Sequence, residues 1–274
     1  MKRKFLVLLS VLLIVILSAV VFAACNGSGK NNSNPSDKGE SQTPETESPM
    51  FYEDMTFDYL YGVIDSAKNY TIVTEEKDYD VSNPDSPVVW SQVLSIVVDN
   101  ATDITYAETI NTKDGETYTM KEYIYQSDSV EYLISLNNYT IGENGAPIKN
   151  ESGNFVLKSA EKKAPAESID MTLGDMGNES FNDFASYTIK SDNLFYPYIY
   201  TYLLYVDGKV IPMPLEGCTA ELIIEDESFG VVYHFIEDGK TVKDYSLLIK
   251  NVNKSALTSV PDEVKAFESE AVEK

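Results

Sequence analysis

Hydrophobic and polar positions divide the chain into three segments. The first, residues 1–24, is a basic triplet followed by an almost unbroken apolar run, which is typical of a signal peptide. The second, residues 25–50, has no large apolar residue between positions 26 and 49. Because such a stretch has nothing to bury, it predicts a disordered polar tether. The third, residues 51–274, mixes apolar and polar residues throughout, and we expect it to fold as a single β-rich domain.

The third segment opens with a helical period. Asp54 or Thr56 can cap a helix, and the apolar residues behind them recur every three to four positions: Phe57, Leu60, Tyr61, Ile64 and Ala67. This spacing predicts a short amphipathic helix with one face to bury. The helix is expected to end at Lys68-Asn69, and residues 70–74 then form the first strand.

Alternating apolar and polar residues predict strands along most of the remaining chain. They cover residues 88–98, 104–110, 118–124, 130–136, 155–157, 194–206, 209–211, 222–224, 231–236 and 245–249. The dipeptide Asp-Gly separates three of the strand pairs, at 114–115, 207–208 and 238–239. Asp-Gly suits a tight hairpin turn that needs positive φ, so the pattern predicts an antiparallel meander.

Three regions do not have the pattern of a strand. Residues 137–150 are rich in Asn and Gly and predict a loop. Residues 164–185 carry apolar residues at helical spacing, interrupted by Gly174 and Gly177, and predict one or two short helices. The charged tail, residues 266–274, is expected to be frayed.

The net charge narrows the range of partners. All 44 acidic residues lie after Cys25, whereas three of the 21 basic residues precede it, so the chain from Cys25 onward has 18 basic residues and a net charge of −26. Nucleic acids and anionic membrane surfaces are bound by clustered Lys and Arg. The charge therefore argues against nucleic-acid binding.

The end of the apolar run, Leu17-Ser18-Ala19-Val20-Val21-Phe22-Ala23-Ala24-Cys25, resembles a bacterial lipobox. In lipoproteins that carry one, the Cys thiol takes a diacylglyceryl thioether and the chain is cut just before it. The resemblance implies a lipid anchor, palmitate or a similar acyl chain, on Cys25 and a place on the extracytoplasmic face of the cell membrane. Phe22 departs from the usual Leu, Val or Ile, and the run approaches the ~20 residues that span a bilayer. An uncleaved signal anchor is thus the alternative.

The order of elements resembles that of lipoproteins with a LolA- or LppX-like fold. The resemblance rests on the opening helix leading into Lys68-Asn69-Tyr70-Thr71, the hairpin Tyr205-Val206-Asp207-Gly208-Lys209 and the ending Val260-Pro261-Asp262-Glu263-Val264. It implies a mainly β (α+β) fold: a curved antiparallel sheet or unclosed barrel covered by the N-terminal helix and short internal helices. It supplies no catalytic residue.

Candidate catalytic residues are few. His234 is the only histidine, which excludes multi-histidine zinc sites, and no GxSxG motif is present. We expect His234 to be a partly buried strand residue with a satisfied hydrogen bond, with catalysis as the alternative. Cys218 is expected to be a small buried apolar residue, with a reactive thiol as the alternative. We therefore predict a non-enzymatic protein without a cofactor or a metal site.

Tyrosine is the residue type that stands out, at 19 positions. The rings of Tyr196, Tyr198, Tyr200 and Tyr202 share one face of a predicted strand, where they could bind a ligand or pack across strands. We expect a monomeric lipoprotein that binds or carries a hydrophobic or amphipathic ligand, such as a lipid, in a half-barrel. The alternative is a cell-surface module that binds glycan or protein through exposed tyrosines.

Overall fold

In the computed structural model, the described residues all belong to one compact unit, Ser48–Lys274. The structure describes residues 51–52, 55–83, 85, 87–143, 145–150, 152–165, 171–172, 188–189, 202–225, 228–257 and 259–274. Cys25, the signal peptide and the tether lie outside these ranges, so their assignments remain predictions. None of the helices within the described ranges has the length and hydropathy that a membrane span requires.

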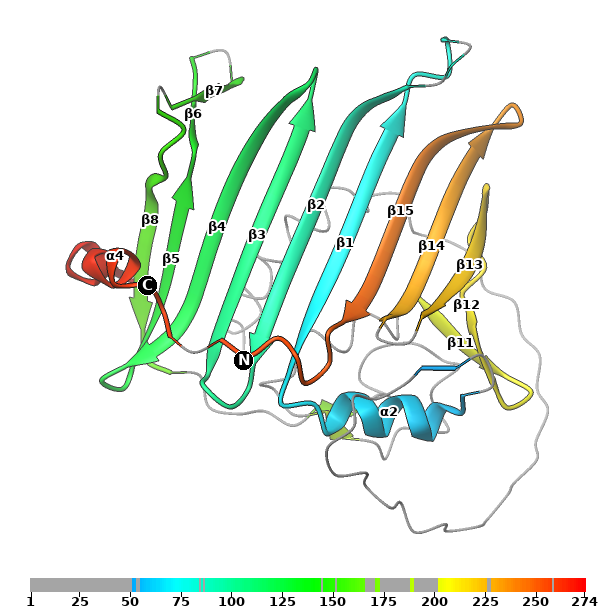
Figure 1. The fold of residues 1–274 in the computed structure, drawn as a ribbon, viewed down its shortest axis with the longest axis horizontal. Coiled ribbons are helices and arrows are strands. Elements are labelled where there is room, and N and C mark those ends of the chain that lie inside the picture. The colour runs from blue at the N-terminus through cyan, green and yellow to red at the C-terminus, as the bar shows by residue number, and fades with distance from the viewer. Residues whose placement is uncertain are drawn as a thin grey trace. The chain divides into compact units, whose positions relative to one another are not determined.

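Ten strands form one large curved sheet that does not close on itself (Figure 1). Its order is β13-β14-β15-β1-β2-β3-β4-β5-β8-β16, and every pair is antiparallel except β8 and β16. The bounds are β1 Asn69–Tyr79, β2 Val88–Asp99, β3 Ile104–Lys113, β4 Glu116–Ser127, β5 Val130–Asn137, β8 Val156–Lys163, β13 Cys218–Glu225, β14 Ser228–Glu237, β15 Lys240–Lys250 and β16 Val272–Glu273. The predicted mainly β, unclosed antiparallel architecture is confirmed.

Smaller elements lie outside this sheet. Three two-stranded pairs are β6 with β7, β9 with β10 and β11 with β12. Their bounds are β6 Tyr139–Ile141, β7 Pro147–Lys149, β9 Met171–Thr172, β10 Thr188–Ile189, β11 Leu203–Val206 and β12 Lys209–Pro212. The helices in the described ranges are α2 Phe57–Asp65, α4 Asp262–Lys265 and the 3-10 helix η4 Ala266–Glu270.

All three predicted Asp-Gly turns are confirmed. Each Asp has a φ near +50° and each Gly a φ near +80°, as at Asp114 (54°) and Gly115 (79°). Two consecutive positive φ values define the type I′ turn, whose twist matches that of the flanking strands. The turn between β4 and β5 has the same form without glycine, at Asp128 and Ser129.

Successive side chains in a strand point to opposite faces, so the neighbours Tyr233 and His234 in β14 mark the two faces of the sheet. Directly paired residues of antiparallel strands share a face. The register therefore assigns Leu247 and Ile249 of β15 to the Tyr233 face, and Asp244 of β15 to the His234 face.

The Tyr233 face carries the larger core. Phe51, just before α2, packs its ring 5.5 Å from that of Phe229, and Phe57 in α2 lies 6.1 Å from Tyr205 of β11. The first turn of α2 is capped by Thr56, whose Oγ1 accepts a hydrogen bond from the N–H of Tyr59 at 3.2 Å. The predicted helix and one of its two candidate caps are thus confirmed, while Asp54 lies outside the described residues.

A crossing segment, residues 251–261, joins β15 to α4 and runs along one end of the central strands (Figure 1). Two buried polar residues hold it there. Asn69 Oδ1 accepts a hydrogen bond from the N–H of Ser255 at 2.6 Å, and Asp99 Oδ2 accepts one from the N–H of Leu257 at 2.7 Å. Because buried polar groups need partners, these contacts explain why two such residues end up inside the protein.

The crossing segment places the C-terminus on the His234 face, where the expectation of a frayed tail was wrong. Val264 and Phe267 pack on a cluster that includes Ile134, and Tyr125 Oη donates a hydrogen bond to Glu268 at 2.9 Å. The short strand β16 then pairs with β8. The apolar residues of this charged tail bury enough surface to dock it.

Two other local predictions differ from the structure. Residues 137–150, predicted as a loop, contain the β6–β7 hairpin, whose strands are only three residues long. In the region predicted as short helices, the described residues 171–172 form β9 instead, paired with β10. Residues 166–170 and 173–185 of that region lie outside the described residues, as do residues 194–201 of the predicted tyrosine-rich strand.

Candidate functional site

Tyr202 is the one predicted ligand-binding residue that the structure describes. Tyr196, Tyr198, Tyr200 and the lipidation residue Cys25 lie outside the described residues. The ring of Tyr202 is half-buried and lies 5.9 Å from Tyr233 and 5.7 Å from Tyr245. The side chain thus packs on the Tyr233 face of the sheet, next to the β11–β12 hairpin.

Tyr233 fastens this hairpin to the sheet. Its side chain is fully buried, and its hydroxyl lies 3.1 Å from two backbone carbonyl oxygens, those of Tyr202 and Met213, which flank the hairpin. Burial raises the pKa of Tyr233, and it is also the largest cause of the raised pKa values of Tyr202 and Tyr245. All three phenols therefore stay protonated at neutral pH, and the Tyr233 hydroxyl can donate to the carbonyl oxygens beside it.

A buried carboxylate lies beside this tyrosine cluster. Glu76 of β1 is almost fully buried and forms an ion pair with Lys243 of β15. The register places Glu76 directly opposite Tyr245, so its negative charge also contributes to the raised pKa of that phenol. The Glu76–Lys243 ion pair thus connects β1 with β15 beside the tyrosine cluster.

Residue chemistry changes across the Tyr233 face. Over β14, β15, β1 and β2 the buried side chains of this face are mostly apolar: Phe229, Val231, Leu247, Ile249, Ile72, Leu94, Ile96 and Val98. Over β3, β4, β5 and β8 a few apolar side chains remain, but polar side chains share the face with them. The polar residues are Thr105, Thr109, Glu122, Ser135, Asn137 and Ser159. We call these the apolar half and the polar half of the Tyr233 face.

Some polar side chains of the polar half form hydrogen bonds with one another. Ser135 Oγ donates a hydrogen bond to Glu122 Oε1 at 2.9 Å, and both residues are paired in the register of β4 and β5. Ser135 and Thr109 are buried, as is Met120 between them. Polar side chains gathered on the inner part of a sheet suit contact with a polar ligand group better than packing against apolar residues.

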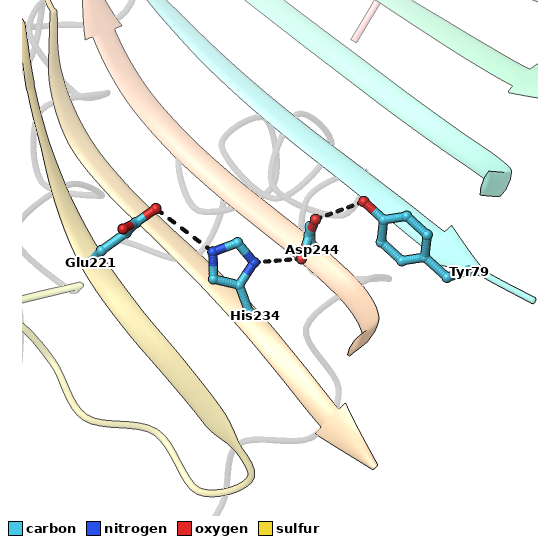
Figure 2. A network of polar contacts seen from close by, with 4 residues as sticks. All are labelled: Tyr79, Glu221, His234 and Asp244. Carbon is cyan, nitrogen blue, oxygen red and sulfur yellow. Dashed lines mark hydrogen bonds and ion pairs between the residues drawn. The ribbon is translucent and has the colours of Figure 1, made fainter. Parts of the chain in front are cut away.

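His234 anchors a polar network on the opposite face (Figure 2). Asp244 Oδ1 lies 2.7 Å from His234 Nδ1 and accepts a hydrogen bond from its N–H, because a carboxylate oxygen is the acceptor of such a pair. Asp244 Oδ2 accepts from Tyr79 Oη at 2.7 Å, and Glu221 Oε1 lies 3.7 Å from His234 Nε2. The network therefore links the four strands β13, β14, β15 and β1 in a row.

The electrostatics of this network favour a charged imidazole. The hydrogen bond to Asp244 is the largest cause of the raised pKa of His234, and Glu221 adds to it. The pKa of Tyr79 is raised to about 12, first by burial and then by its hydrogen bond to Asp244. The expectation of a partly buried histidine with a satisfied hydrogen bond is confirmed. An imidazole placed between two carboxylates therefore cross-links β13, β14 and β15.

Cys218 is half-buried rather than fully buried, as the first residue of β13. Its Sγ donates to the carbonyl oxygen of Leu215 at 3.3 Å, and burial raises the pKa of the thiol. A thiol with a raised pKa is a poor nucleophile at neutral pH. Within the described ranges, no group of three or more His, Cys, Asp or Glu side chains is arranged to hold a metal ion.

Sequence reasoning missed several residues of both faces. Tyr79 and Asp244 are 165 positions apart, and no local pattern shows that β1 and β15 are neighbours. The apolar half could be recognised from the alternation within each strand, whereas the polar half could not, because Thr109 and Ser135 look like solvent-facing residues in sequence. Compared with known proteins, the chain matches no family model and no curated protein.

Proposed function

We propose that the protein is a non-enzymatic, membrane-anchored extracytoplasmic lipoprotein that binds a hydrophobic or amphipathic ligand on the Tyr233 face of its half-barrel. The observation that carries this proposal is the change from an apolar half to a polar half across that face. An amphiphile has the same division, and it can bury its tail against one half while its head group meets the other.

The geometry of the sheet favours a ligand of this kind. The sheet is curved and does not close on itself, and its strand order ends at β13 and β16. α2 and the β11–β12 hairpin approach the Tyr233 face on the side of β14 and β15, through Phe229 and Tyr233. Ligand sites are largely apolar and carry a few polar groups, and the side chains of the Tyr233 face have this composition.

The anchor is part of the same proposal. The lipobox-like segment ending in Cys25 would attach the chain to the outer-facing membrane surface, and the polar tether would give the domain roughly 25–30 Å of reach from it. A protein in that position has direct access to membrane amphiphiles. The resemblance to LolA- and LppX-like lipoproteins agrees with this assignment and adds no residue to it.

The alternative, a surface module that binds glycan or protein through exposed tyrosines, receives less support. Tyr202 is packed between Tyr233 and Tyr245, so its ring face is occupied by the protein itself. The alternative therefore depends on Tyr196, Tyr198 and Tyr200, and replacing Tyr198 and Tyr200 by Ala would abolish glycan binding if it holds.

Photo-crosslinking tests the proposal in the full-length chain. Membranes that contain the protein are exposed to a phospholipid with a diazirine in its acyl chain, and labelled peptides are mapped by mass spectrometry. Leu222 and Ile223 are neighbours in β13 that point to the Tyr233 face and the His234 face respectively. We expect Leu222→Gln to lower labelling of β14, β15 and β1 several-fold, and the matched Ile223→Gln to leave it unchanged. Labelling confined to the chain before residue 51 would refute the proposal.

A further inference from the structure

An unpartnered acceptor lies in the polar half of the Tyr233 face. Asn137, the last residue of β5, is 8% exposed, and its side-chain Oδ1 is fully buried without a hydrogen-bond partner. A buried polar atom without a partner is uncommon in proteins, and each one needs a physical explanation. The backbone carbonyl of the same residue is satisfied, since it accepts from Asn150 Nδ2 at 3.3 Å. The site thus offers one buried oxygen that can accept a hydrogen bond.

Close by lies a lysine that forms no ion pair with any carboxylate of the described residues. Lys158 of β8 reaches across β5 to β4, where its Nζ lies 3.1 Å from Met120 Sδ, a weak acceptor. Nearby lysines differ, because Lys163 pairs with Glu131 at 2.7 Å and Lys121 with Glu108 at 3.8 Å. In a chain with 44 acidic residues, an ammonium whose hydrogen-bond contact is a thioether is available for an anion from outside.

Met120 brings the two groups together. It pairs directly with Asn137 in the register of β4 and β5, and side chains of such pairs lie next to each other on one face. Lys158 contacts the same methionine, so the ammonium and the buried acceptor flank one side chain. The Glu122–Ser135 pair follows one step further along both strands.

We propose that Lys158 and Asn137 form a head-group site for an anionic amphiphile whose head group also carries hydroxyl groups. The Lys158 ammonium binds the anionic group, a phosphate or a carboxylate, and Asn137 Oδ1 accepts a hydrogen bond from a hydroxyl. This proposal rests on the proposed function and fixes the orientation of the ligand. The head group lies over β4, β5 and β8, and the tail extends toward β2, β1 and β15.

Three phospholipid probes with the same diazirine-bearing acyl chains test the site in membranes that contain the full-length chain. Phosphatidylglycerol is anionic and has hydroxyls, phosphatidic acid is anionic without them, and phosphatidylcholine is zwitterionic. We expect phosphatidylglycerol to label peptides of β4, β5 and β8 about tenfold more than phosphatidylcholine, as one charge-assisted hydrogen bond allows. Lys158→Gln should abolish this preference. The matched Lys149→Gln, at an exposed lysine of β7, should keep it.

Asn137→Ala separates the second contact from the first. It should lower labelling by phosphatidylglycerol to the level of phosphatidic acid and leave phosphatidic acid itself unchanged. Equal labelling by phosphatidylglycerol and phosphatidylcholine, or no effect of Lys158→Gln, would overturn the head-group site while the proposed function stands. Complete displacement of the probe by soluble glycerol 3-phosphate would also overturn it, because the ligand would then need no tail. No labelling of the Tyr233 face by any probe would remove both proposals.

Discussion

Replacing Asp244 by Asn should remove the pH dependence that His234 gives to protein stability. The hydrogen bond to Asp244 is the main reason that the pKa of His234 lies above its ordinary 6.5. A group whose pKa is higher in the folded than in the unfolded state stabilises the folded state fully below the unfolded value. The stabilisation is lost as pH rises through the folded value. The contribution of His234 is therefore expected in full at about pH 5.5, below the ordinary pKa, and is expected to be smaller at about pH 8.5.

The geometry sets the size of the effect. His234 Nδ1 and Asp244 Oδ1 are 2.7 Å apart, which is a good hydrogen-bond length, but the two side chains are 35% and 26% exposed. A hydrogen bond to a charged group contributes about 1.5–3 kcal/mol, whereas an exposed ion pair contributes about 0.2–1 kcal/mol. Because solvent screens this pair in part, we expect about 1 kcal/mol.

Urea unfolding at the two pH values measures this contribution. The difference in free energy of unfolding between them is compared for the native protein, His234→Gln and Asp244→Asn. Glu237→Gln serves as the control for the loss of one carboxylate, because Glu237 is exposed and lies in β14, the strand of His234. We expect the native protein and Glu237→Gln to share the same pH dependence and the other two variants to lose about 1 kcal/mol of it. If Asp244→Asn behaves like the control, the coupling between the two residues does not exist.

Three further predictions concern packing and the anchor. An added Cβ at Gly230 would lie 2.0 Å from the backbone oxygen of Leu247. Gly230→Ala should therefore lower the free energy of unfolding by about 3 kcal/mol in urea titrations. Gly62→Ala should raise the free energy of unfolding slightly, because Gly62 lies in α2 with open space around it. Val264→Ala should lower the free energy of unfolding by about 2 kcal/mol in the same assay, because the Val264 side chain is almost fully buried in the cluster that includes Ile134. An unchanged urea midpoint would show that the C-terminal segment is not docked. Cys25→Ser should abolish labelling by an alkyne-tagged fatty acid, and labelling that survives the substitution excludes the lipobox.

Local features of the fold could be predicted from the sequence because their causes are local. The Asp-Gly turns need positive φ, which glycine permits at low cost, and Asp207-Gly208 takes the expected conformation with φ values of 51° and 79°. Thr56 caps α2 because its side-chain oxygen can reach the first turn. The neighbour relation of β1 and β15 depends on tertiary packing between segments far apart in sequence, so no local signal carries it.

At the C-terminal tail, the high content of acidic residues concealed the apolar positions that dock it. Its acidic residues suggested exposure, yet Phe267 packs on the same cluster as Val260 and Val264, which precede the tail at helical spacing. The candidate site also has a part that the sequence predicts and a part that it does not. The alternation of each strand predicts which residues share a face, but the meeting of Lys158 with Met120 requires β8, β5 and β4 to lie side by side.

Native mass spectrometry of the full-length chain released from membranes tests amphiphile binding to the Tyr233 face most directly. We predict a population heavier than the covalent mass by one non-covalently bound amphiphile, which dissociates on collisional activation. This population should decrease in Leu222→Gln and Lys158→Gln and persist in Ile223→Gln and Lys149→Gln. A chain that carries no mass beyond its covalent one, or a bound mass that is equal in all four variants, would contradict the proposed function.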